Sequence, residues 1–156
     1  MKKFILLFVL AVVLCGISSQ TASAQAIAVI VHKSSSMSNL SFAELKNYFK
    51  LESQFWKNNE RVFAATLAYE KPEATRFNSL VYELPNDGVK KLWIQKIFRE
   101  QIKEAPKLQR TEEDMLKYVS ATSGAIGFIS ADKVDASVKV LTIDGASPKD
   151  GNYKLK

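Results

Sequence analysis

The sequence contains one cysteine, Cys15, and one histidine, His32, among its 156 residues. A lone cysteine cannot form an intramolecular disulfide, and one histidine with scattered carboxylates has no metal-ligand spacing. The Gly-x-Ser-x-Gly, His-Glu-x-x-His and Gly-x-x-x-x-Gly-Lys-Ser/Thr motifs are also missing. We therefore expect no catalytic residue, no metal and no cofactor. The enzymatic alternative has to use His32, at the edge of a serine-rich loop.

Long hydrophobic runs are missing too, except at the start of the chain. Lys2 and Lys3 precede an apolar run over residues 4–14, and Ala22-Ser23-Ala24 follows it. This order of charge, apolar run and small residues predicts a signal peptide over residues 1–24, cleaved after Ala24. The alternative is an uncleaved membrane anchor. Leu14 before Cys15 is not the small residue that a lipoprotein signal needs, so lipidation of Cys15 is not expected. Export predicts a periplasmic or secreted protein, stable without disulfides.

Cleavage would leave about 132 residues, the size of one compact domain. The 20 basic residues beyond the predicted signal peptide exceed the 16 acidic ones by four. This mild excess suits a small anion or an acidic envelope partner. A nucleic-acid partner does not fit an exported protein, and stable membrane insertion is not expected after cleavage.

Apolar and polar segments alternate in a way that predicts an α/β fold. Strands are expected over residues 26–32, 61–68, 125–129 and 138–143, followed by a polar tail. Helices are expected over residues 41–49, about 72–83 and about 88–104, with a fourth starting at residue 111. Strands that alternate with helices indicate a mostly parallel sheet of about four to five strands, covered on both faces. The first strand is apolar without alternation, which favours a parallel, buried strand. Side chains predicted for the core include Trp56, Phe77, Trp93, Ile97 and Phe98.

Ligands of parallel sheets bind where the carboxyl ends of strands lead into helices. Two stretches at such places carry groups that hold oxyanions: Ser34, Ser35 and Ser36 after the first strand, and Thr75 and Arg76 at the start of the second helix. We name these five residues as the candidate ligand site. The alternatives are a solvated serine linker and a surface arginine.

The stretch Ser120-Ala-Thr-Ser-Gly-Ala-Ile-Gly-Phe-Ile-Ser130 carries two glycines three residues apart. Gly124 stands where a left-handed residue ends a helix, and Gly127 lies inside a strand where another element comes close. With residues 40–49, the Phe55-Trp56 pair, residues 61–67, Trp93 and residues 112–119, this stretch resembles the phosphate-type substrate-binding proteins of bacterial ABC transporters. The resemblance covers roughly residues 27–143.

The resemblance implies a three-layer αβα lobe of the type 2 periplasmic-binding-protein fold over residues 25–156. It implies an exported solute-binding protein that holds a small oxyanion such as phosphate without chemistry, with an ABC permease or another envelope protein as partner. Family members have two lobes, and the chain has the length of one. The family's Arg and Gly-Ser-Gly-Thr loop should fall at residues 67–76, where no glycine stands and Glu70 and Glu73 do. The alternative is therefore a single-lobe interaction module that has lost its ligand.

Overall fold

The computed structural model describes residues 25–156. The predicted signal peptide and Cys15 lie outside the described residues. Among residues 25–156, no helix combines the length and the apolar character needed to cross a membrane.

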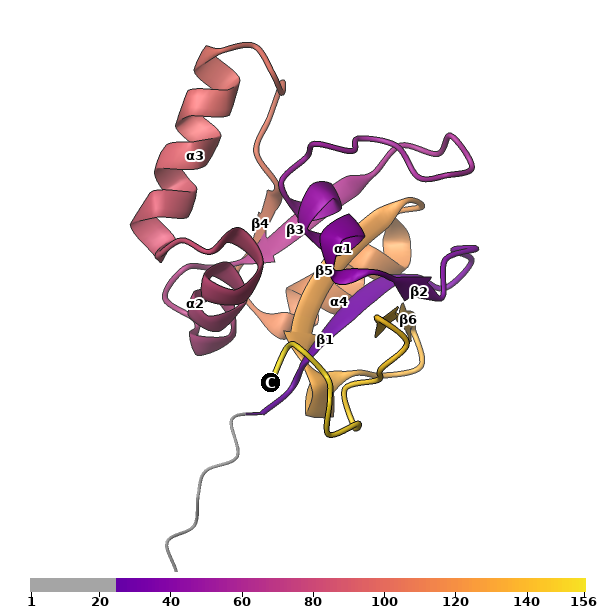
Figure 1. Ribbon diagram of the computed structural model, residues 1–156. Coiled ribbons are helices and arrows are strands. Elements are labelled where there is room, and N and C mark those ends of the chain that lie inside the picture. Colours follow the sequence, from indigo (N-terminus) through magenta and orange to yellow (C-terminus); the bar gives the residue numbers. More distant parts are fainter. Residues whose placement is uncertain (1–24) are drawn as a thin grey trace, which may run out of the picture.

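Helices and strands alternate along the described chain much as the sequence predicts (Figure 1). The strands are β1 (Ile27–His32), β2 (Asn39–Leu40), β3 (Phe63–Leu67), β4 (Lys107–Gln109), β5 (Ala125–Ser130), β6 (Val138–Val140) and β7 (Thr142–Ile143). The helices are α1 (Phe42–Phe49), α2 (Pro72–Phe77) with the wider π-helical turn η1 (Asn78–Tyr82), α3 (Asn86–Phe98), α4 (Glu112–Ala121) and the short 3-10 turn η2 (Ala131–Lys133).

A five-stranded sheet in the order β4-β3-β5-β1-β6 forms the centre of the molecule, and β2 and β7 pair separately. Strands β4, β3 and β5 are parallel, whereas β1 is antiparallel to both of its neighbours, β5 and β6. Four of the five strands therefore point the same way, which confirms the mostly parallel sheet. The predicted parallel direction of β1 is wrong. Its unbroken apolar run reflects burial on both faces, which a central strand has in either direction.

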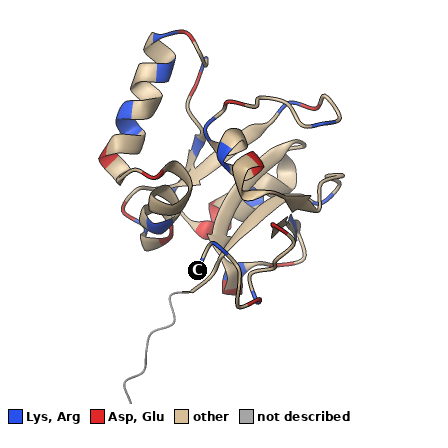
Figure 2. Cartoon of the chain, viewed as in Figure 1, with Lys and Arg blue, Asp and Glu red and all other residues tan. Residues whose placement is uncertain are grey.

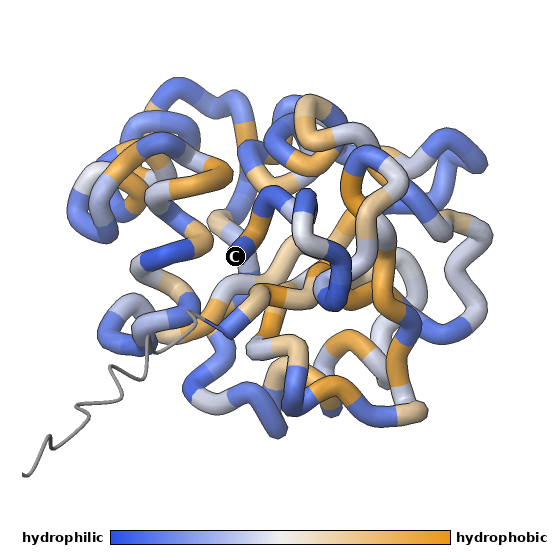
Figure 3. Tube along the Cα trace, turned by 60° about the horizontal axis from the view of Figure 1, so that its bottom comes forward, coloured by the Kyte–Doolittle hydropathy of each residue, from blue (hydrophilic) through white to orange (hydrophobic). Residues whose placement is uncertain are grey.

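Helices cover both faces of this sheet, as expected for the three-layer lobe. On one face, Phe77 from α2 stacks on Phe128 from β5 with ring centroids 3.8 Å apart, and Phe49 from α1 meets both rings edge-on. On the other face, Met115 and Val119 from α4 lie against Gly127. A Cβ on Gly127 would come within 2.4 Å of the Met115 sulfur, so its small size lets α4 approach, as predicted. Figure 3 shows hydrophilic segments mostly along the outside of the trace, with hydrophobic segments between them.

Predicted helix starts and stops follow the local sequence closely at three places. Ser41 and Glu44 form the expected capping box of α1, and the Thr111 hydroxyl accepts a hydrogen bond from Asp114 N–H at the start of α4. Gly124 adopts φ +76°, the expected left-handed conformation. A Cβ there would lie 2.2 Å from the Arg61 carbonyl oxygen, so no side chain fits.

The third long helix, α3, differs from its prediction. It ends at Phe98 rather than near residue 104, and Glu100 takes a left-handed φ of 56°. Val89 and Trp93 face inward, with Trp93 edge-on to Tyr82. Ile97 and Phe98 were predicted to be buried, but they are 42% and 88% exposed. Because α3 lies at the margin of the fold, only one side of it finds a partner among the described elements (Figure 1).

The C-terminal segment also departs from prediction. The expected strand over residues 138–143 is divided into β6 and β7. The expected polar tail folds back and buries Tyr153 and Leu155. Ile27 N–H donates to the Leu155 carbonyl at 2.8 Å, and the Tyr153 hydroxyl donates to the Ile27 carbonyl at 2.8 Å. The tail therefore completes the start of β1.

Candidate functional site

The carboxyl ends of β3, β4 and β5 lie at one end of the sheet, together with the start of β1. At this end of the sheet the chain leaves β3 and enters α2, opposite the start of α3. An open cavity of about 530 Å³ lies there. It is lined by Tyr69, Glu70, Thr75, Pro85, Asn86, Asp87 and Lys90. The place agrees with the rule for ligand sites in open α/β sheets.

Asn86 holds the polar side of this cavity together. Its amide nitrogen donates to the Tyr69 carbonyl at 2.7 Å and to the Thr75 hydroxyl oxygen at 2.9 Å. Its amide oxygen accepts from the side-chain nitrogen of Asn78, which is fully buried, at 2.9 Å. The end of β3, the first turns of α2 and the start of α3 are thus joined by one side chain, which positions the Thr75 hydroxyl.

The charges around the cavity are mixed. The Lys90 ammonium lies 3.2 Å from Asp87 Oδ1 and 5.1 Å from the centre of the Tyr69 ring. Glu70 adds an exposed second carboxylate. Burial raises the pKa of Tyr69, so its phenol stays neutral. The Lys90 ammonium and the Thr75 hydroxyl can bind a ligand oxyanion, whereas both N–H groups of the Asn86 amide are already donated within the protein. The two carboxylates disfavour a high negative charge and favour a ligand that retains a proton.

Thr75 and Arg76 are adjacent in sequence but lie in different surroundings. Arg76 is in the last turn of α2, and its guanidinium donates to the Gln25 carbonyl at 2.6 Å, at the entry to β1. Its Nε is buried and has no hydrogen-bond partner within residues 25–156. Arg76 therefore does not line the Thr75 cavity, although both residues lie at the same end of the sheet.

Carboxylates gather at this same end of the sheet, near the end of β5. Ser130 N–H donates to a Glu112 carboxylate oxygen at 2.6 Å. Burial raises the pKa of Glu112, and the nearby charges of Glu73 and Asp132 raise it further, although the Ser130 hydrogen bond opposes this.

The serine loop lies at the opposite end of the sheet, because β1 runs against β3 and β5. The Ser34 hydroxyl contacts His32 Nδ1 at 2.7 Å, and the Ser35 hydroxyl oxygen accepts from Met37 N–H at 3.2 Å. Ser36 is exposed beside them. Two of the three hydroxyls thus take part in the fold of the loop. The structure does not bring residues 34–36 and 75–76 together, so one small ligand cannot contact both groups.

Asn86 and Lys90 complete the cavity, and sequence reasoning did not assign them to the site. The sequence predicts Asn86 or Asp87 as the cap of the third helix, but the cap residue is Pro85 and Asn86 points to the end of β3 instead. The only sequence feature that could have indicated a role for Asn86 is its position after the second predicted helix, which brings the chain back to the carboxyl ends of the strands. Across residues 25–156, no three His, Cys, Asp or Glu side chains are arranged to hold a metal ion.

A scan against protein-family models finds no match, and a search of curated proteins finds none either. Solved structures do match. A phosphate transport receptor of an ABC system from Vibrio cholerae superposes with a TM-score of 0.65 and 20% identity, over 80% of this chain and 48% of that one. PstS from Borrelia burgdorferi superposes with a TM-score of 0.64 and 14% identity, over 84% of this chain and 54% of that one.

A putative phosphate ABC transporter substrate-binding protein from Clostridium perfringens, solved with bound phosphate, gives a TM-score of 0.62 and 19% identity, over 80% and 47%. The chain thus spans about half the length of the structures it matches. The predicted resemblance is confirmed at the level of the fold.

Proposed function

We propose that the protein is an exported, single-lobe solute-binding protein that holds a small oxyanion such as phosphate, without covalent chemistry. The observation that carries the proposal is the cavity at the carboxyl end of β3, with Thr75, Asn86 and Lys90 around it. The fold adds support, because it is shared with proteins described as phosphate receptors. An ABC permease or another envelope protein would receive the ligand.

The charges around the cavity indicate which charge state of the ligand binds. Glu70 and Asp87 outnumber Lys90, so a dianion meets net repulsion. A monoanion that keeps a proton can donate it to one of the carboxylates while its other oxygens accept from Lys90 and Thr75. The open cavity excludes little water, and we therefore expect weak binding. We also expect the affinity for phosphate to fall as the pH rises through the second ionisation of phosphate.

The test is calorimetry and thermal melting of the purified protein with phosphate, sulfate and acetate. A ligand at ten times its dissociation constant should raise the melting temperature by about 5 °C. Thr75→Val and Lys90→Gln should each weaken binding about tenfold. Lys91→Gln is the matched control, because Lys91 is exposed and does not line the cavity.

Absence of both heat and a melting shift with all three anions would overturn the proposal. The alternative, an interaction module without a ligand, would then be tested by capture of a stoichiometric envelope protein in the absence of added anion.

A further inference from the structure

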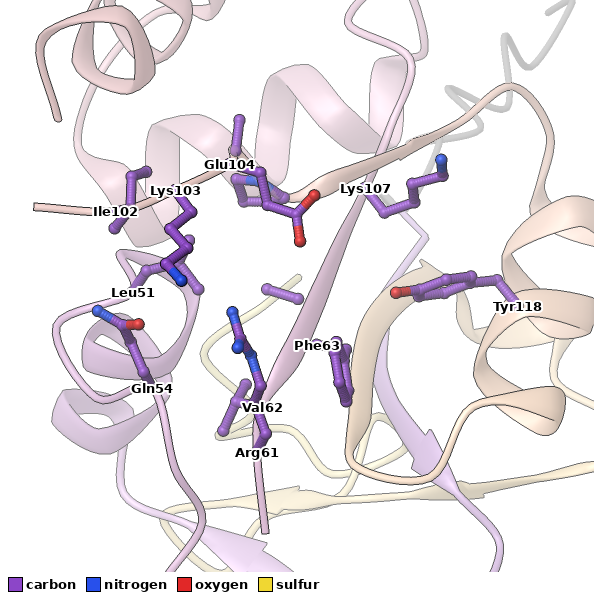
Figure 4. A pocket seen from close by; sticks show the side chains of 13 residues that line it. Leu51, Gln54, Arg61, Val62, Phe63, Ile102, Lys103, Glu104, Lys107 and Tyr118 are labelled. Carbon is purple, nitrogen blue, oxygen red and sulfur yellow. The ribbon is translucent and has the colours of Figure 1, made fainter. Parts of the chain in front are cut away.

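A second cavity lies at the other end of the sheet from the Thr75 site. It is smaller, about 90 Å³, and sits beside the first residues of β3, between the chain that follows α1 and the segment that leads into β4. Arg61 and Phe63 form its floor, Ile102, Lys103 and Glu104 one side, and Tyr118 the other (Figure 4). None of these residues belongs to the proposed phosphate site.

Uncompensated positive charge surrounds this cavity. Three basic residues, Arg61, Lys103 and Lys107, line it, and Glu104 is the single acidic one. Within residues 25–156, none of the four forms an ion pair within 4.0 Å. Figure 4 shows the Arg61 guanidinium and the Glu104 carboxylate pointing toward the middle of the cavity, while Lys107 extends away from it. At the cavity, the two positive charges of Arg61 and Lys103 therefore exceed the one negative charge of Glu104, and the charge of Lys107 lies at the outer side.

The rest of the wall is apolar or aromatic. Val62, Ile102 and Pro106 are buried, and the Arg61 guanidinium lies 5.8 Å from the centre of the Phe63 ring. The Tyr118 hydroxyl points into the cavity from α4. Burial raises the pKa of Tyr118, so the hydroxyl keeps its proton and can donate it. Positive charge beside an apolar wall suits a ligand with a charged end and an apolar body.

We propose that this cavity binds a small organic monocarboxylate. The Arg61 guanidinium forms the bidentate pair with the carboxylate, as its planar donors favour, and Lys103 adds the second cation. The Tyr118 hydroxyl donates to the same carboxylate, and the apolar body packs on Phe63 and Ile102. At roughly 10–15 Å³ for each water-sized group, the cavity holds about seven such groups, which suits a compact body such as a single ring. Glu104 disfavours a second negative charge on the ligand.

The test is an NMR titration of the ¹⁵N-labelled protein with benzoate, with benzylamine as the cationic analogue of the same shape. Benzoate should shift the amide signals of Arg61, Phe63, Lys103 and Tyr118 in a saturable way, and benzylamine should not. Arg61→Gln should weaken benzoate binding about tenfold or more, because it removes a charge-assisted pair. Arg99→Gln is the matched control, an exposed arginine at the end of α3 that does not line the cavity.

Glu104→Gln separates the monocarboxylate from other ligand classes. For a monocarboxylate this change removes a repulsion, so benzoate should bind several-fold more tightly. Tighter binding of phenylalanine than of benzoate, lost in Glu104→Gln, would overturn the proposal in favour of a zwitterion. The absence of saturable shifts at these residues, or unchanged binding in Arg61→Gln, would also overturn it. Lys90→Gln should leave benzoate binding unchanged, which keeps this test separate from that of the phosphate site.

Discussion

At the scale of single residues, Glu44 shows how a local contact produces a pH-dependent stability. Its carboxylate accepts from the Lys57 ammonium at 2.7 Å and from the Ser41 backbone N–H and hydroxyl, both at 2.9 Å. The Lys57 hydrogen bond, followed by those from Ser41, lowers the pKa of Glu44 to about 2. Because the folded pKa lies below the unfolded value, the charged carboxylate stabilises the fold above about pH 4.3.

We expect Glu44→Gln to lower the free energy of unfolding at pH 7 by about 0.5 kcal/mol, a small effect because solvent screens the partly exposed Lys57 pair. The difference from the unmodified protein should shrink as the pH falls from about 4 toward 2, where Glu44 becomes protonated. Urea unfolding at pH 7, 4 and 2.5 measures this. A difference that stays constant across the three pH values would contradict the assigned pKa.

At the scale of elements, α3 is a helix with two apolar sides and one partner. Trp93 is buried against Tyr82, whereas Ile94 and Phe98 are 67% and 88% exposed on the outer side. Figure 2 shows basic residues along the same helix. The inner side of the helix therefore holds it to the fold, and the exposed side chains of Ile94 and Phe98 contribute little to stability.

We expect Trp93→Ala to lower the free energy of unfolding by about 3–5 kcal/mol, because it empties a buried, ring-sized space. Phe98→Ser should change it by less than about 0.5 kcal/mol, because that side chain is already in water. The two variants remove aromatic rings five residues apart on one helix, so they serve as controls for each other in urea denaturation. Similar losses in both would show that the outer side of α3 is covered.

The elements also separate what could be predicted from what could not. Caps such as Ser41 and Thr111 were predictable, because each depends on contacts within one turn of helix. The direction of β1 was not, because burial on both faces gives the same apolar run in parallel and antiparallel strands. That error placed the Ser34 loop at the wrong end of the sheet. Thr75 was predicted at the strand ends and does line a cavity there, but Asn86 joins it only through tertiary contacts.

At the scale of the whole molecule, the C-terminal residues pack against the start of β1. Leu155 is fully buried, and its carbonyl accepts from Ile27 N–H at the start of β1. We expect Leu155→Ala to lower the free energy of unfolding by about 2–5 kcal/mol. Lys156→Ala, at the exposed neighbouring position, should change it by less than about 0.5 kcal/mol. Equal effects in thermal or urea unfolding would mean that the C-terminal segment does not dock.

The hydrogen bond between Ile27 and Leu155 has a consequence for the order in which the elements can follow one another along the chain. Since the two ends of the described chain meet, a short linker can join residue 156 to residue 25, and new ends can open in the exposed turn at Asn58 and Asn59. Such a circular permutant keeps every strand pairing of the sheet. The same adjacency lets the whole lobe be inserted as a cassette into a loop of another protein, because its entry and exit lie side by side.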